Sequence, residues 1–127
     1  MCVVSGKLSE GINFSDRLGR AVMMVGLPFA NLASVELKEK LEYMKARGSV
    51  GNEFYENMCM RAVNQSIGRA IRHREDYATI ILFDVRFGYA RIKSKLPKWI
   101  RDAGVQVYED FKEVVEVTSD FFKKKTE

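Results

Sequence analysis

The chain has 127 residues, of which 46% are hydrophobic and 30% are charged, a composition that is typical of a globular domain and excludes a disordered chain. The formal net charge of +4 permits a nucleic-acid partner but does not require one. No apolar run approaches the roughly 18 residues that span a bilayer, and the first residues lack the apolar stretch of a secretory signal, so we expect an intracellular protein with no membrane partner.

Two cysteines and one histidine limit the metal chemistry that the chain can support. Cys2 and Cys59 are too few for a four-thiolate iron–sulfur cluster or zinc site, and with His73 they cannot complete a Cys₂His₂ site. Cys59 falls within an apolar helical pattern, which favours a buried small side chain over a reactive thiol. We therefore predict that this chain holds no metal.

The first half of the chain predicts two strands and a helix. Val3-Val4 is a short strand candidate, and residues 21–25 form a continuous apolar run typical of a strand covered on both faces of a parallel sheet. A helix is then predicted from Ser34, a plausible N-cap, because leucine and methionine recur at helical spacing. Gly48 supplies the stop of this helix.

The second half predicts a longer helix, two strands and a C-terminal helix. Asn52 can cap a helix that runs towards Arg72. Residues 79–83 form a second continuous apolar run, and residues 105–107 are a shorter strand candidate. One face of the last helix is traced by Phe111, Val114, Val115, Thr118, Phe121 and Phe122. The lysines at 123–125 are better explained by the affinity of cations for a helix C-terminus than by a DNA-binding tail.

The order of these elements predicts the fold class. Strands that alternate with helices favour an α/β fold with a mostly parallel sheet flanked by helices. No internal repeat, low-complexity stretch or linker divides the sequence, so we expect a single domain over residues 1–127. Because the chain opens almost directly in a strand, we also expect the sheet to lack its beginning.

A polar stripe lies on the predicted helix 52–72. At 3.6 residues per turn, Gln65, Arg69 and Arg72 fall within a sector of about 60° opposite the apolar side. On helical geometry alone, such a stripe is more often a solvated face than a site. The functional interpretation is that two guanidiniums and an amide are aimed at one anionic group, because the planar fork of arginine can hold phosphate oxygens bidentately.

The loop after the first strand candidate, residues 6–16, is a second candidate site. Ligands of open α/β sheets bind beyond the carboxyl ends of strands. Gly6 and Gly11 would let the backbone approach a ligand closely. Hydrogen-bonding groups are offered by Ser9, Glu10 and Asn13. Taken alone, these residues are also those of an ordinary polar turn.

Some catalytic arrangements are absent from the sequence. It contains neither a GxxxxGK(S/T) phosphate loop nor a GxGxxG motif, so it carries no recognisable nucleotide cradle of its own. His73 is the single histidine and lies in a basic stretch, which excludes a Ser-His-acid arrangement and favours a solvated histidine.

The two candidate sites resemble motifs of one enzyme family. Residues 6–16 resemble motif V of the XPD-type superfamily-two DNA helicases, and residues 65–72 (QSIGRAIR) match motif VI, the QxxGRxxR element. The resemblance extends over nearly the whole chain, to residues 22–29, 84–87 and 96–100. Within the family, the chain looks most similar to the chromosome-loss helicases. The resemblance implies the C-terminal part of a RecA-like second motor domain.

The resemblance implies a role for each matched residue of motif VI. Arg69 and Arg72 would be the catalytic arginine fingers, which reach the γ-phosphate of ATP across the cleft between two motor domains. Gln65 would bind the nucleotide by helping to order that γ-phosphate site.

Motif V supplies the other implied contacts. Glu10, Gly11 and Asn13 would line the nucleotide cleft, and Lys7 and Ser9 would lie towards the DNA backbone. Asn13 stands where many relatives carry aspartate, so its contact with a ribose hydroxyl would lack a charge.

The resemblance further implies an ATP-dependent DNA helicase that unwinds DNA in the 5′ to 3′ direction, in the nucleus and in DNA repair. Its partners would be DNA and the remainder of the helicase polypeptide. ATP with Mg²⁺ would be shared with the first motor domain, and an iron–sulfur cluster would belong to that domain and not to this chain. Because the first domain is missing from this sequence, we do not expect the isolated chain to be catalytically competent.

Two other interpretations stay open at this point. The chain is alternatively a non-catalytic nucleic-acid- or protein-binding module derived from a helicase domain, or a structural domain whose basic stripe is solvated. Sequence that encodes a phosphate loop immediately upstream would favour the enzyme over both.

Overall fold

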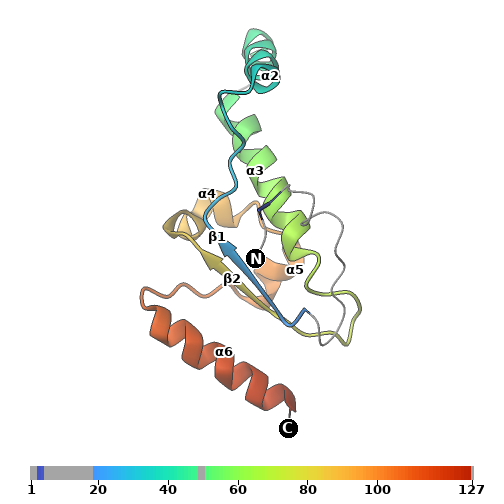
Figure 1. The fold of residues 1–127 in the computed structure, drawn as a ribbon, viewed down its shortest axis with the longest axis vertical. Coiled ribbons are helices and arrows are strands. Elements are labelled where there is room, and N and C mark those ends of the chain that lie inside the picture. Colours follow the sequence, from blue (N-terminus) through green and yellow to red (C-terminus); the bar gives the residue numbers. More distant parts are fainter. Residues whose placement is uncertain (1–2, 5–18, 49–50, 127) are drawn as a thin grey trace. The chain divides into compact units, whose positions relative to one another are not determined.

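The structure, a computed structural model, describes residues 3–4, 19–48 and 51–126, and its chain forms two compact units. Within the described residues, the first unit, Met1–Pro97, holds β1 (Ala21–Val25), α2 (Val35–Ala46), α3 (Gly51–Ile67), β2 (Thr79–Phe83), the 3₁₀ helix η2 (Val85–Gly88) and α4 (Ala90–Lys93) (Figure 1). The second unit, Lys98–Glu127, holds α5 (Lys98–Ala103) and α6 (Phe111–Thr126).

β1 and β2 form a parallel sheet, as Figure 1 shows. The register runs from Ala21 opposite Thr79 to Val25 opposite Phe83. The hydrogen bonding continues at the carboxyl end, where the Gly26 N–H donates to the Phe83 carbonyl at 3.1 Å. Parallel strands need a long crossover, and here it contains α2 and α3. The predicted α/β class with a parallel sheet flanked by helices is confirmed.

The two short strand candidates were wrong. Val3-Val4 and residues 105–107 have no strand structure, and β1 and β2 are the strands of the described residues. The reason is that two or three residues offer too few ladder hydrogen bonds to be held without an adjacent partner strand. Val107, for example, is 64% exposed.

The core of the first unit lies along one side of α3, which packs against β1 and α2. Val63 and Ile67 have no solvent exposure, and Cys59 is 2% exposed, so the prediction of a buried cysteine is confirmed. Other elements complete the core with Met24, Leu27, Leu37, Phe87, Ile92 and Leu96. Burial of these apolar side chains provides the main free energy that holds α3 on the sheet.

α2 begins and ends where the sequence predicts. Ser34 is the N-cap, with an extended backbone, although its side chain makes no capping hydrogen bond. At the other end, Gly48 has a φ of 76° and donates its N–H to the Lys45 carbonyl at 3.0 Å. Glycine adopts this left-handed conformation without a Cβ clash, which explains the stop.

α3 ends five residues earlier than predicted. Its last residue is Ile67, and the following turn is tightened by bonds from the Arg69 N–H to the Ser66 carbonyl (3.4 Å) and from the Ala70 N–H to the Ile67 carbonyl (3.0 Å). Gly68 weakens the helix at this point because glycine loses most conformational freedom in a helix. The helix therefore does not reach Arg72, and at its start Asn52 lies inside the first turn rather than at the cap.

The second unit confirms the predicted C-terminal helix. α6 carries its apolar residues on one side, and four of them are half-buried: Val114, Thr118, Phe121 and Phe122. The three lysines at 123–125 lie in its last turn, as expected for cations at a helix C-terminus. Among the helices that the structure describes, none has both the length and the apolar character to cross a membrane.

We predict that Ile67→Ala lowers the free energy of unfolding by about 2–5 kcal/mol, because it removes a fully buried side chain and leaves a cavity between α3 and its neighbours. Denaturant unfolding followed by circular dichroism measures the change. Leu32→Ala is the control, since Leu32 is 51% exposed and the same truncation there should stay within about 0.5 kcal/mol. Equal losses in the two variants would contradict this assignment of the core.

Candidate functional site

The three residues of the predicted polar stripe lie at the junction that follows α3. Gln65 is exposed in the last turn of the helix, Arg69 is half-buried in the turn beyond it, and Arg72 is exposed in the non-helical segment that follows. The single helical sector predicted for them is therefore wrong, because the helical geometry ends at Ile67. The two arginines are placed by the turn and by the connection to β2 instead.

Gln65 also lines a hollow of about 570 Å³ on the side of α3 that faces Lys95. The hollow is formed with Asn57, Met60, Arg61, Asn64 and Lys95. Asn64, one of the lining residues, donates from Nδ2 to the Lys95 carbonyl at 3.0 Å. The amide of Gln65 thus shares its surroundings with two basic side chains, Arg61 and Lys95.

The connection from α3 to β2 is organised by one carboxylate, that of Asp76. Its Oδ2 accepts a hydrogen bond from the Arg72 backbone N–H at 3.2 Å, and its Oδ1 accepts from the Tyr77 N–H at 2.9 Å. The Arg20 Nη1 also donates to Oδ1, at 2.6 Å. The Asp76 side chain is 1% exposed, so these donors replace water around it.

Two opposing effects set the pKa of Asp76. Burial raises it, but the hydrogen bonds from the backbone N–H groups of Arg72 and Tyr77 and from Arg20, with the charge of Arg20, outweigh burial and lower the pKa. The carboxylate is therefore held in its ionised form. A charged acceptor makes these hydrogen bonds roughly twice as strong as neutral ones.

Arg20 connects this carboxylate to the start of the sheet. It immediately precedes β1, and its carbonyl accepts the Thr79 N–H at 2.9 Å at the first pair of the ladder. Its Nη1 donates to the Tyr77 carbonyl at 2.9 Å, and its guanidinium lies 3.9 Å from the centroid of the Tyr77 ring. The segment around Asp76 is thereby fixed to the strands.

An aspartate–arginine pair stands at the carboxyl end of the sheet. Asp84 follows β2 directly, and its Oδ1 accepts hydrogen bonds from the Arg86 N–H and Nε, both at 2.9 Å. Its Oδ2 accepts from the Arg86 Nη2 at 2.7 Å. The same guanidinium lies 5.5 Å from the centroid of Phe29, which follows β1. The pair thus connects the segments that leave the two strands.

The side-chain hydrogen bonds from Arg86 are the main reason that the pKa of Asp84 falls to about 2. Burial opposes this decrease, while the backbone N–H groups of Arg86 and Leu27 add to it. Asp84 is therefore ionised at neutral pH, and its charge contributes to holding η2 at the end of β2.

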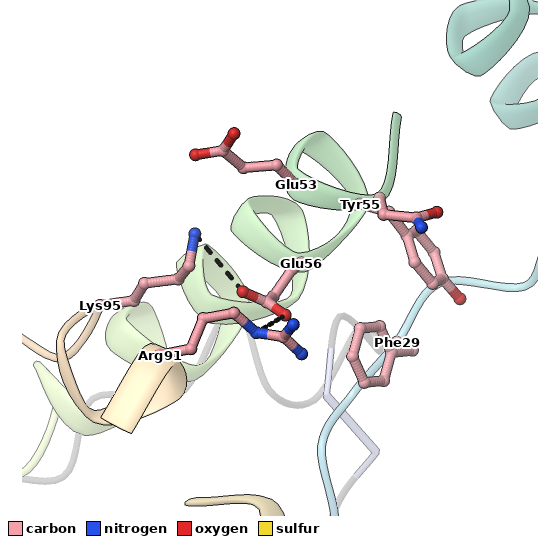
Figure 2. Close-up of a pocket in the computed structure, with 7 residues that line it drawn as sticks. Phe29, Glu53, Tyr55, Glu56, Arg91 and Lys95 are labelled. Carbon is pink, nitrogen blue, oxygen red and sulfur yellow. Dashed lines mark ion pairs between the residues drawn. The ribbon is translucent and has the colours of Figure 1, made fainter. Parts of the chain in front are cut away.

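A cavity of about 710 Å³ lies between the first half of α3 and α4. Figure 2 shows Glu56 in the centre, with ion pairs from its carboxylate to the Arg91 Nε (2.9 Å) and the Lys95 Nζ (3.5 Å). Phe29 and Tyr55 stack on the other side, with ring centroids 5.0 Å apart. The Glu56 carboxylate on α3 pairs with both cations, so this cluster joins α3 to the residues around α4.

The described residues offer little to a metal ion. None of them form a group of three or more histidine, cysteine, aspartate or glutamate side chains placed to bind one. Burial is the main cause that raises the pKa of the Cys59 thiol to about 11, so this thiol stays protonated at neutral pH.

The sequence profile of the helicase C-terminal domain family matches residues 1–103. This chain belongs to that family. It is similar to the ATP-dependent DNA helicase CHL1 of Coccidioides immitis, with 56% identity over 117 residues, which are 80% of this chain and 14% of that protein.

Two further relatives support the assignment. The ATP-dependent DNA helicase chl1 of Schizosaccharomyces pombe is 49% identical over 97% of this chain and 15% of its own length. The ATP-dependent DNA helicase chl-1 of Caenorhabditis elegans is 51% identical over 95% of this chain and 15% of its own length. The resemblance predicted from motifs V and VI is confirmed, and this helicase C-terminal domain spans about a seventh of the length of these relatives.

Motif V of this helicase C-terminal domain lies outside the described residues. That applies to all five of its predicted contacts: Lys7, Ser9, Glu10, Gly11 and Asn13. Their roles stay predictions.

The sequence reasoning missed the residues that organise the segment after α3. Asp76 and Arg20 were not singled out, because their partners are set by the return of the chain to the start of β1. One signal was available: an acid four positions after Arg72 in a short connection between a helix and a strand. Glu75 carries the same charge, however, and only the structure shows which of the two is buried.

We predict that Asp84 makes the stability of this domain fall in acid. Because its folded pKa of about 2 lies below the ordinary value, its contribution is present above about pH 4 and is lost as the pH falls towards 2. Asp84→Asn should cost about 1 kcal/mol at pH 7, since Arg86 is 43% exposed and the pair is screened.

Urea unfolding at intervals from pH 7 to pH 2 tests this. The Asp84→Asn variant should lose less stability below pH 4 than the unmodified chain does, whereas Glu42→Gln, at an exposed position on α2, should leave the acid limb unchanged. A parallel decline in the unmodified chain and Asp84→Asn would refute the assignment.

Proposed function

We propose that this chain is the C-terminal segment of the second motor domain of an ATP-dependent DNA helicase. It would supply motif V and the arginine fingers of motif VI to an ATP site that a first motor domain completes. The observation that carries the proposal is the fixed backbone at Arg72, in a segment whose sequence matches motif VI and whose Asp76 acceptor ties it to the sheet. The names of its relatives, ATP-dependent DNA helicases, support the reaction.

Arg69 and Arg72 would act on the γ-phosphoryl group of ATP. Negative charge spreads over the equatorial oxygens as that group leaves, so a guanidinium placed there stabilises the transition state more than the ground state. The donor set fits this ligand, because guanidiniums hold phosphate oxygens and the amide of Gln65 can donate beside them. Hydrolysis of bound ATP, with Mg²⁺ held by the first motor domain, would provide the free energy for translocation.

Motif V would make the remaining contacts. Glu10, Gly11 and Asn13 would line the nucleotide cleft, and Lys7 and Ser9 would contact the DNA backbone. A charged lysine binds phosphate without reading the base sequence, so the DNA contact would be independent of sequence.

The wider assignment follows from the same family. The iron–sulfur cluster would belong to the first motor domain, since the two cysteines of this chain cannot ligate it. The helicase would act on DNA in the nucleus; the names of its relatives support only that the substrate is DNA. The full-length helicase means here the polypeptide that carries residues 1–127 together with the first motor domain.

We predict that Arg72→Ala in the full-length helicase lowers the kcat of DNA-stimulated ATP hydrolysis by about 10³–10⁵-fold, the range typical of an arginine finger. The affinity for ATP should change little, because the lost contact matters most in the transition state. Phosphate release measures kcat, and binding of a fluorescent ATP analogue measures affinity.

Arg72→Lys and Arg74→Ala serve as comparisons. Arg72→Lys should rescue little, because an ammonium keeps the charge but loses the planar fork. Arg74 is an exposed arginine two positions away, and its loss should leave kcat within about twofold, as for surface substitutions away from a site. Near-normal ATP hydrolysis by Arg72→Ala would remove the arginine-finger proposal.

We predict that Lys7→Ala in the full-length helicase weakens binding to single-stranded DNA uniformly across base sequences. The slope of log affinity against log salt should decrease by roughly 0.7, which corresponds to one phosphate contact on a single strand. Fluorescence anisotropy with oligonucleotides of two compositions provides the measurement. Lys40→Ala is the matched control, since Lys40 pairs with Glu36 on α2; an unchanged slope for Lys7→Ala would exclude the contact.

A further inference from the structure

We propose that Asp76 is a positioning residue, which fixes the backbone at Arg72 and so directs that guanidinium towards the ATP site. The inference rests on the proposed function of Arg72. Its basis is geometric: Arg72 lies outside α3, so no helical hydrogen bond holds its backbone N–H. The Asp76 carboxylate accepts that N–H at 3.2 Å instead.

The Asp76 carboxylate closes a small loop around residues 72–76. While Oδ2 holds the Arg72 N–H, the Asp76 backbone N–H donates to the His73 carbonyl at 3.1 Å. The start of the loop is thus bound to its end twice, once through the side chain of Asp76 and once through its backbone. A loop closed in this way has few backbone conformations left, and the Cα of Arg72 is fixed with it.

The same carboxylate fixes the loop to the sheet. Its Oδ1 accepts from Arg20 at 2.6 Å, and Arg20 is bound through its carbonyl to the first residue of β2 at 2.9 Å. Hydrogen bonds therefore connect β2 to Arg20, Arg20 to Asp76, and Asp76 to the backbone of Arg72. Removing the carboxylate would leave the backbone at Arg72 without this connection.

Aspartate is required because three donors meet at two oxygens. The Arg72 N–H, the Tyr77 N–H and the Arg20 guanidinium all donate to the carboxylate, whose side chain is 1% exposed. In Asp76→Asn one oxygen becomes an NH₂ group, which cannot accept a hydrogen bond. At least one donor then loses its acceptor, and the backbone of the loop has to shift.

The test compares kcat in single and double variants of the full-length helicase. A misplacement of about 1 Å can cost on the order of 10²-fold in rate, so Asp76→Asn should lower the kcat of ATP hydrolysis by about that factor while the affinity for ATP stays within about twofold. In the Arg72→Ala background, Asp76→Asn should have no further effect on single-turnover hydrolysis, because the group that it positions is already absent.

Glu75→Gln is the matched control. It makes the same change of charge and chemistry at the adjacent, exposed position, and it should leave kcat unchanged in both backgrounds. If Asp76→Asn does not fold, Arg20→Lys replaces it in the same cycle. Lysine keeps the charge but loses the planar guanidinium that lies 3.9 Å from the Tyr77 ring centroid and places Nη1 against Asp76, so kcat should fall only while Arg72 is present.

The outcomes separate the two proposals. If Asp76→Asn lowers kcat by the same factor with and without Arg72, the residue acts through general stability and the positioning role is overturned. If Arg72→Ala abolishes turnover while Asp76→Asn has normal kcat, the positioning role fails and the arginine finger stands. If Arg72→Ala has near-normal turnover, the arginine finger fails, and the positioning role fails with it.

Discussion

The parallel pairing of β1 with β2 is the constraint on which the first unit depends. Because parallel strands start at the same edge, the pairing brings Arg20 at the beginning of β1 beside Thr79 at the beginning of β2. It also brings the segments that leave both strands together at the opposite edge, where Asp84 binds Arg86. The two carboxylates that organise this domain, Asp76 and Asp84, therefore stand at opposite ends of one short ladder.

α3 is held in the first unit by two different kinds of interaction. On its apolar side, Val63 and Ile67 are completely buried. The hydrophobic contacts of these side chains do not depend on the direction of particular atoms. On the side that faces α4, the carboxylate of Glu56 forms ion pairs with Arg91 and Lys95. These ion pairs, unlike the hydrophobic contacts, require the charged atoms to face one another. The apolar contacts thus hold the helix on the sheet, while the ion pairs set the position of the residues around α4 relative to it.

The arginines of motif VI, Arg69 and Arg72, lie beyond the end of α3. The planar fork of a guanidinium holds phosphate oxygens only when it is correctly placed. α3 ends at Ile67, before both arginines. The backbone N–H of Arg72 is then bound by the buried carboxylate of Asp76. Outside the helix, the acceptor for this N–H is a side chain rather than a helical carbonyl.

The sequence by itself determined the class of fold, the two strands, α2, α6 and the family, since these follow from local periodicity, from caps such as Gly48 and from motifs read in order. It also singled out Gln65, Arg69 and Arg72 as a group. Only the tertiary structure decided that α3 stops before the arginines and that Asp76, not Glu75, is the buried acceptor. Gly68 weakens the helix locally, but the acceptor of the Arg72 N–H is a carboxylate that is itself held by Arg20. Arg20 is far away in the chain, and helical periodicity carries no information about such a partner.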